Sequence, residues 1–206
     1  MSESPSPGVA VEAAARLESF LRNEVESPLA DGLRAEDPDE LRSAVERALA
    51  AIQDLHFLAD RAAGERSLHD LDRLVDQALE RYRDISSVPL ELSRPPNPQQ
   101  VRVDADAFGD ALFLVLHNAE QFGTGEPVEV KLSNGETYAS VLVEDRGPGF
   151  TAEALSRAYD PFYSTSDRGL GLGLPQARHL MESMGGEIHL RNGPQGGVVE
   201  LLLPVA

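Results

Sequence analysis

Residues 143–150 read V-E-D-R-G-P-G-F, and further along the chain Y-D-P-F-Y-S-T occupies 159–165 and S-D-R-G-L-G-L-G-L occupies 166–174. The first segment follows the apolar run Val141-Leu142-Val143, which places it where a strand ends in a loop. In such a loop the carboxylate of Asp145 can accept a hydrogen bond from an amino group such as that of adenine. Gly147 and Gly149 let the backbone approach a flat ring closely. The stretch is therefore suited to binding a nucleotide base.

Three alternating glycines precede a segment with helical periodicity. The glycines are Gly169, Gly171 and Gly173, and the apolar positions after them are Leu174, Ala177, Leu180, Met181 and Met184. Glycines that open a helix expose unpaired N–H groups to a phosphate chain, beside the positive end of the helix dipole. Each loop alone has an ordinary alternative, because D-R-G-P-G also suits a tight turn and the glycine spacing differs from the dinucleotide and P-loop fingerprints. Together they predict a nucleotide pocket.

The order of the motifs is more specific than any one of them. The succession is N-A at 118–119, D-x-G-x-G at 145–149, D-P-F-Y at 160–163, G-x-G-L-G-L at 169–174 and G-G-E-I at 185–188. This succession resembles the ATP-binding domain of bacterial sensor histidine kinases, in the superfamily shared with gyrase and related ATPases. The resemblance covers roughly the last two thirds of the chain. It implies ATP and Mg²⁺ as cofactors.

The composition excludes several classes of partner and chemistry. The 206 residues include 35 acidic and 18 basic side chains, and the net charge of -17 argues against nucleic acid or an anionic membrane as a partner. The absence of cysteine excludes disulfides, thiolate metal sites and a cysteine nucleophile. No apolar run approaches membrane-spanning length, and the N-terminus lacks the pattern of a signal peptide. We therefore expect a soluble, cytoplasmic protein.

The N-terminal third predicts a helical hairpin. Residues 1–8 are rich in Ser and Pro and are predicted to be disordered. An amphipathic helix is expected over 9–34, with an interruption at Pro28, and Asp37 is expected to cap a second helix that ends at Gly64. The first apolar stripe comprises Val11, Leu17, Leu21, Val25, Leu29 and Leu33, and the second Leu41, Val45, Leu49, Ile52, Leu55 and Ala59.

A hairpin with one apolar stripe on each arm cannot bury both stripes by itself. Pairing of residues 9–64 with a second copy into a four-helix bundle is the economical solution, so we expect a homodimer. The alternative is that both stripes pack on the C-terminal domain. A sensor domain is not expected.

Residues 67–206 are expected to form the ATP-binding domain, an α/β sandwich. Ser67 is predicted to cap a helix with a stripe from Leu71 to Leu79, and short strands are expected near 88–92 and 101–103, on either side of a Pro-rich loop. A long helix follows from about Ala105 to Phe122. Further strands are predicted at 128–132 and 138–143 around an Asn134-Gly135 turn, and at 187–191 and 198–203. The predicted fold class is α+β, with helices on one face of a mixed sheet.

The resemblance implies roles for four further residues. Asn118 would hold the magnesium ion through its amide oxygen, and Asp145 would recognise the adenine amino group, with Gly147 and Gly149 permitting its approach. Phe162 would pack under a lid over the nucleotide. Arg168, in the short segment before Gly169, would meet a phosphate, although a solvated loop arginine is an equal alternative.

The phosphate side of the site departs from the family. One turn before Asn118, where the family usually has a second Asn or His, this chain has Leu114. Three residues after Asn118, where a Lys is common, it has Gln121. The predicted pocket has therefore lost polarity and a positive charge.

The segment Asn23-Glu24-Val25-Glu26-Ser27-Pro28-Leu29 resembles the family's phospho-acceptor box, with Asn23 in place of the histidine. An amide nitrogen is not a nucleophile at neutral pH, whereas an imidazole is. Glu24, which would assist the imidazole as a base, is left without its substrate. Neither His56 nor His69 has the neighbours expected of an acceptor. A chance match of Pro-Leu in an amphipathic helix is the alternative.

These features predict a histidine-kinase-like signalling protein that binds ATP and Mg²⁺ but does not phosphorylate itself. One alternative is a nucleotide-independent pseudokinase or adaptor that docks a response-regulator receiver domain or a partner histidine kinase. Another is an active kinase that transfers phosphate to a histidine of a partner chain. A third, a Ser/Thr kinase of the anti-sigma-factor type, usually lacks such a hairpin.

Overall fold

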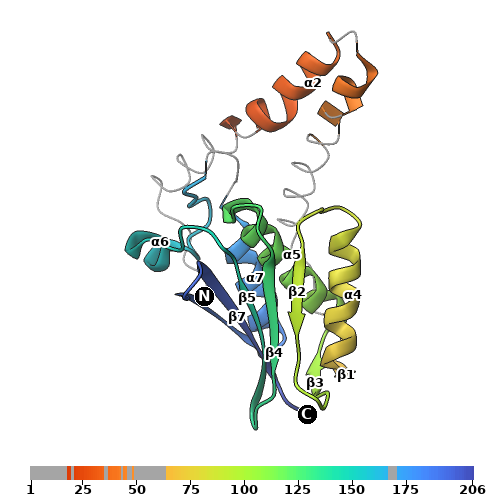
Figure 1. The fold of residues 1–206 in the computed structure, drawn as a ribbon, viewed down its shortest axis with the longest axis vertical. Coiled ribbons are helices and arrows are strands. Elements are labelled where there is room, and N and C mark those ends of the chain that lie inside the picture. Colours follow the sequence, from red (N-terminus) through yellow and green to blue (C-terminus); the bar gives the residue numbers. More distant parts are fainter. Residues whose placement is uncertain are drawn as a thin grey trace. The chain divides into compact units, whose positions relative to one another are not determined.

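The computed structural model describes residues 18–19, 21–34, 37–42, 44–45, 48, 64–166 and 171–206. These residues belong to two compact units (Figure 1). One unit comprises the described parts of 1–60 and 160–172, and the other the described parts of 61–159 and 173–206.

The second unit is built on a five-stranded mixed sheet with the order β2-β4-β5-β7-β6. Its strands are β2 (Leu90–Ser93), β4 (Val128–Ser133), β5 (Tyr138–Glu144), β6 (Glu187–Asn192) and β7 (Gly197–Pro204). β2 runs parallel to β4, and all other neighbours are antiparallel. Alternate residues of β4, β5 and β7 are buried, as expected of a sheet with one face in the core.

Three longer helices enclose the core of this unit. They are α4 (Leu71–Arg83), α5 (Ala105–Phe122) and α7 (Gly173–Ser183), and a short helix α6 spans Ala152–Arg157. α5 contacts β4, β5 and β7, α7 contacts α5 and the β6–β7 pair, and α4 packs on α5. The largest fully buried side chains include Tyr82, Phe108, Leu79, Leu112 and Met181. The predicted α+β class, with helices packed on a mixed sheet, is confirmed.

Local signals located α5 correctly. Asp104 caps the helix by accepting hydrogen bonds from the backbone N–H groups of Asp106 (3.0 Å) and Ala107 (3.2 Å). The helix ends at Phe122, before Gly123. β4 and β5 form the predicted hairpin, but residues 134–137 join them, and neither Asn134 nor Gly135 has the positive φ that a tight two-residue turn requires.

The prediction that Ser67 caps a helix is wrong. Ser67–Asp70 is a strand, β1, which pairs antiparallel with β3 (Gln100–Val103) in a separate two-stranded sheet. Pairing with β3 satisfies the backbone groups of this segment, so the helix begins later. Asp70 is the N-cap of α4 and accepts from the N–H of Arg73 (3.3 Å). His69 therefore lies on a strand, where its ring contacts the hydroxyl of Ser67.

The described residues of the hairpin show two helical arms in contact. A π-helix, η1 (Leu21–Glu26), precedes α2 (Ser27–Gly32), which has Pro28 in its first turn. Proline lacks an N–H for the carbonyl four residues earlier and clashes with it, so the interruption takes the form of a wider helical turn. Asp37 accepts from the N–H of Asp39 (2.9 Å) at the start of the second arm, as predicted. Gly32 lies against Ala44 and Leu41.

Several predictions fall outside the described residues. They concern the disordered segment 1–8, the stripe positions Val11, Leu17, Leu49, Ile52, Leu55 and Ala59, and His56. Over the ranges that are described, no helix combines the length and apolar character that a membrane crossing requires.

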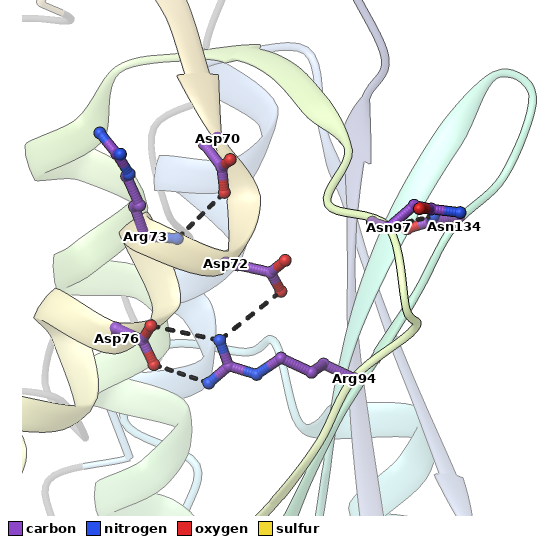
Figure 2. A network of polar contacts seen from close by, with 7 residues as sticks. All are labelled: Asp70, Asp72, Arg73, Asp76, Arg94, Asn97 and Asn134. Carbon is purple, nitrogen blue, oxygen red and sulfur yellow. Dashed lines mark hydrogen bonds and ion pairs between the residues drawn. The ribbon is translucent and has the colours of Figure 1, made fainter.

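The Pro-rich loop after β2 is fixed at both ends (Figure 2). The Arg94 guanidinium donates to both carboxylate oxygens of Asp76, at 3.2 and 2.7 Å, and lies 3.9 Å from Asp72. At the other end the amide of Asn134 donates to the carbonyl of Asn97 (2.9 Å). The loop thereby links α4 to the β4–β5 turn.

Two carboxylates beside Arg94 are expected to respond oppositely to substitution. The hydrogen bond from Arg94 lowers the pKa of Asp76, whereas burial raises the pKa of Asp72. A lowered folded-state pKa means that the charged form stabilises the fold above the unfolded value and that this contribution is lost as pH falls through the folded pKa. A raised folded-state pKa means that ionisation of the side chain destabilises the fold, and this destabilisation disappears when the side chain is protonated.

We therefore expect Asp76→Asn to lower the melting temperature at pH 7 and Asp72→Asn to raise it. Each effect should stay within about 1 kcal/mol, because Arg94 is partly exposed to solvent. The Asp72 difference should shrink first, as the pH falls toward the ordinary aspartate pKa of about 4, and the Asp76 difference should shrink only below that pH. Thermal denaturation of the two variants across this pH range measures the effect, and shifts of the same sign at pH 7 would contradict the assignment.

Candidate functional site

Asp145 is the first residue after β5 and its side chain is 5% exposed. Its carboxylate Oδ1 accepts two backbone hydrogen bonds, from the N–H of Gly147 (2.8 Å) and the N–H of Gly197 (3.1 Å). Within the described ranges no donor contacts Oδ2. The loop therefore fixes one oxygen of the carboxylate and leaves the other as an acceptor for a ligand.

The loop after Asp145 rests on the end of α5. A Cβ added to Gly147 would overlap the backbone oxygen of Phe122, the last residue of that helix. The hydroxyl of Thr124 donates to the carbonyl of Arg146 (3.1 Å), and the Arg146 guanidinium lies 3.5 Å from Glu91 and 3.8 Å from Glu126. The missing side chain at Gly147, predicted to permit the approach of a ligand, thus also permits this contact with the helix.

The turn between β6 and β7 forms the other side of the loop. Asp145 N–H donates to the carbonyl of Gly197 (3.0 Å), which makes the pairing of these two residues reciprocal. A Cβ at Gly197 would lie 2.7 Å from Oδ2 of Asp145, and one at Gly196 would overlap the Asp145 backbone. From the sequence this segment is predicted only as a turn. The adjacent pair Gly196-Gly197 was the available signal, because paired glycines at a strand start often mark a close backbone approach.

Asn118 lies on α5 one helical turn before Phe122, and its side chain is half-buried. In the described part of the chain no group forms a hydrogen bond with its amide. Leu114, one turn earlier, is buried in the core. α7 packs along α5, and its first residue, Gly173, belongs to the same compact unit as Asn118. Asp145, Gly147, Gly149, Asn118 and Gly173 thus share one unit.

The predicted lid residues belong to the other unit. Phe162 has a positive φ of 66°, and its N–H donates to the carbonyl of Gly171 (3.1 Å). Gly171 also has a positive φ, of 69°, and a Cβ there would overlap the backbone of Tyr163. A left-handed conformation at a bulky residue is strained and marks a constrained segment. Arg168 and Gly169 lie outside the described residues.

Asn23 lies in the middle of the π-helix η1 and is exposed. Its amide donates to the hydroxyl of Ser19 (3.4 Å), while Arg22 pairs with Glu18 (2.7 Å). π-turns occur frequently at functional sites. The side chain of Glu24 lies outside the described residues.

The residues present suit a nucleotide with a hard cation. In the ranges that the structure describes, no cluster of three or more His, Asp or Glu side chains could bind a metal by itself. Mg²⁺ commonly takes one or two protein oxygens and completes its shell with phosphate oxygens and water. The amide of Asn118 is an oxygen donor of this kind, and Oδ2 of Asp145 is an acceptor suited to a base amino group.

Residues 103–206 match the family model described as "Histidine kinase-, DNA gyrase B-, and HSP90-like ATPase". The match spans more than half of the 206 residues. It includes α5, the Asp145 loop, α7 and the β6–β7 turn.

The chain is similar to parts of longer sensor kinases. It is 33% identical over 133 residues to the sensor protein kinase PilS of Pseudomonas aeruginosa, covering 62% of this chain and 25% of PilS. It is 28% identical over 178 residues to the sensor protein FixL of Bradyrhizobium diazoefficiens, covering 81% of this chain and 35% of FixL. The chain thus spans between a quarter and about a third of the length of these two relatives.

Solved structures show the same fold. The mycobacterial sensor histidine kinase MprB superposes with a TM-score of 0.61 at 26% identity, over 68% of this chain and 97% of that one. The histidine kinase AdeS of Acinetobacter baumannii gives a TM-score of 0.66 at 17% identity, over 96% and 95% of the two chains. The second likeness shows the fold alone.

Two glycine substitutions should have opposite effects on stability. Gly147→Ala forces a methyl group into the backbone of Phe122, and overpacking of this kind costs about 1–3 kcal/mol. Gly109→Ala is the matched control, because it lies within α5 and its Cβ would meet nothing within 4 Å. Alanine there should stabilise the protein by about 0.5–1 kcal/mol. Urea denaturation of both variants measures the difference, and equal stabilities would contradict the proposed contact.

Proposed function

Because the chain belongs to the family of histidine kinase-, DNA gyrase B- and HSP90-like ATPases, and contains an ATP-binding domain of the bacterial sensor histidine kinase type, we propose a specific role within signal transduction. The protein binds ATP with Mg²⁺ but does not phosphorylate itself. Domains of this family bind ATP with Mg²⁺, and particular residues of this chain are proposed to bind each part of that ligand.

The observation that carries the proposal is the arrangement of the Asp145 carboxylate. Two backbone N–H groups hold Oδ1 in place, and Oδ2 is left as an acceptor on the side of Gly197. An adenine amino group is a donor that this atom can bind. Gly149 has a φ of 74°, a left-handed conformation that glycine adopts readily and that shapes the exit of the loop.

The phosphates and the cation are assigned to the other end of the site. Asn118 is proposed to bind Mg²⁺ through its half-buried amide oxygen. The first N–H groups of a helix have no partners within the helix, so the N-terminus of α7 at Gly173 and the preceding Arg168, Gly169 and Gly171 are proposed to contact the phosphate chain. Phe162 is proposed to pack beneath this segment. When bound, ATP supplies a transferable γ-phosphoryl group.

Asn23 is the reason to exclude self-phosphorylation. It is exposed on a helical arm, where a phospho-acceptor has to be, but an amide cannot carry a phosphoryl group as an imidazole does. Glu24 would then lack the group that it assists as a base. The retained box around Asn23 supports loss of the acceptor from an otherwise kinase-like arm.

The hairpin is proposed to dimerise and to dock a signalling partner. Among its described residues Leu33, Leu41 and Val45 are exposed, and Leu33 is 76% exposed. Apolar side chains on both arms support pairing with a second copy. A response-regulator receiver domain or a partner histidine kinase is the expected partner. The domain boundaries 1–8, 9–64 and 67–206 and the cytoplasmic location stay predictions.

Nucleotide binding should be visible as stabilisation. At a concentration of MgATP one hundred times the Kd, the free energy of unfolding should rise by about 2.7 kcal/mol and the melting temperature with it. Asp145→Asn should abolish this shift, because the amide can keep the two loop hydrogen bonds through its oxygen while it presents a donor in place of Oδ2. Asp84→Asn, at the exposed end of α4, is the control and should retain the shift. No shift in the parent protein at millimolar MgATP would overturn the proposal.

Placing a histidine at position 23 tests whether the chain lacks only the phospho-acceptor or lacks phosphotransfer activity altogether. Incubation with γ-labelled ATP and Mg²⁺ should leave the parent chain unlabelled. If only the acceptor was lost, Asn23→His should acquire an acid-labile label, and Asn23→His combined with Asp145→Asn should not. Acid-labile labelling of the parent chain would contradict the assignment of Asn23. Labelling of an added partner chain would favour the active-kinase alternative.

A further inference from the structure

The six-residue turn Asn192–Gly197 connects β6 to β7 and holds the Asp145 loop at several points. Beyond the reciprocal pairing of Asp145 with Gly197, the carboxylate of Glu144 accepts from the N–H of Gln195 (3.1 Å). A Cβ at Gly193 would overlap that same carboxylate. The turn thus contacts the end of β5 at Glu144 and the first residue of the loop, Asp145.

Asn192 supplies the contact at the far end of the loop. Its Oδ1 accepts from the N–H of Phe150 (2.7 Å), and its Nδ2 donates to the carbonyl of Phe150 (2.9 Å). The Asn192 side-chain amide therefore pairs with both backbone groups of Phe150, as the backbone of a neighbouring strand would. Asparagine can do so because its side chain carries a donor and an acceptor at once.

Gly149, immediately before Phe150, makes this contact possible. Its φ is 74°, and a Cβ there would lie 2.7 Å from Oδ1 of Asn192. At the other side of the turn, a Cβ at Gly197 would lie 2.7 Å from Oδ2 of Asp145 and 2.9 Å from the ring of Phe150. The ring of Phe150 and the acceptor oxygen of Asp145 are therefore neighbours, and Asn192 fixes the backbone that carries the ring.

We propose that Asn192 is a positioning residue for the base-recognition site. By pairing with both backbone groups of Phe150, it fixes the exit of the D-R-G-P-G loop relative to Oδ2 of Asp145. This inference rests on the proposed binding of ATP. Without the clamp, Gly149 and Phe150 gain conformational freedom that has to be given up when a nucleotide binds, so affinity and base selectivity fall together.

The experiment compares the binding of ATP and GTP by the full chain in the presence of Mg²⁺. The two nucleotides differ at position 6 of the purine, where ATP has an amino group and GTP an oxygen. We expect Asn192→Ala to weaken ATP binding about tenfold and GTP binding less, so that the ratio of ATP affinity to GTP affinity falls. Asn192→Gln keeps both a donor and an acceptor, so its ratio of ATP affinity to GTP affinity should stay closer to that of the parent protein than the ratio in Asn192→Ala does.

Asn134→Ala is the matched control. Asn134 is also a turn asparagine whose amide donates to a backbone carbonyl, but it lies at the opposite end of β5 from Asp145. It should lower the melting temperature without changing the ratio of ATP to GTP affinity. If Asn192→Ala is too unstable to titrate, Asn192→Asp, which keeps the acceptor for the Phe150 N–H, takes its place.

The outcomes separate this inference from the proposed function. An unchanged ATP:GTP ratio in the Asn192 variants would overturn the positioning role while leaving ATP binding intact. A parent protein that does not bind ATP would overturn both. A lower ratio in the Asn192 variants and an unchanged ratio in Asn134→Ala would support the inference.

Discussion

The antiparallel pairing of β5 with β7 determines where Asp145, the central residue of the proposed base-recognition site, lies. The two strands are in register from Tyr138↔Pro204 to Glu144↔Val198, and the next pair along the ladder is Asp145 with Gly197. The candidate site is therefore a continuation of the sheet, in which a carboxylate oxygen substitutes for one backbone acceptor. A carboxylate held by backbone groups does not depend on the conformation of other side chains. This explains how a loop of small residues can present one oxygen in a defined direction.

Asp145 and the arm that carries Asn23 belong to different compact units. Asp145, Asn118 and the start of α7 lie in one compact unit, whereas Phe162, Gly171 and the arm with Asn23 lie in the other. Loss of the acceptor at position 23 therefore leaves the geometry of the Asp145 carboxylate unchanged. A chain built in this way can lose phosphotransfer and keep a ligand-binding domain intact.

The sequence predicted the elements that depend on local signals. α5 has a capping aspartate, sustained apolar periodicity and a terminal glycine, and its limits matched. The β4–β5 hairpin and the position of Asp145 after a strand were equally local, although the connection is longer than the two-residue turn expected at Asn134-Gly135. By contrast, β1 consists of only Ser67–Asp70, and its identity depends on pairing with β3, which no local pattern of S-L-H-D reveals. α6 is too short for periodicity, although Thr151 three residues before Ala154 was a usable cap. The bonds of Asn192 to Phe150 join residues 42 positions apart, so only the fold brings them together.

The π-helix at Leu21–Glu26 has a consequence for how the first arm can be compared with an ordinary α-helix. A π-turn contains about one residue more than an α-turn, so side chains on either side of it are out of phase by about 100° around the helix axis. The angular direction of Asn23 is thus set by this phase shift as well as by its place in the sequence.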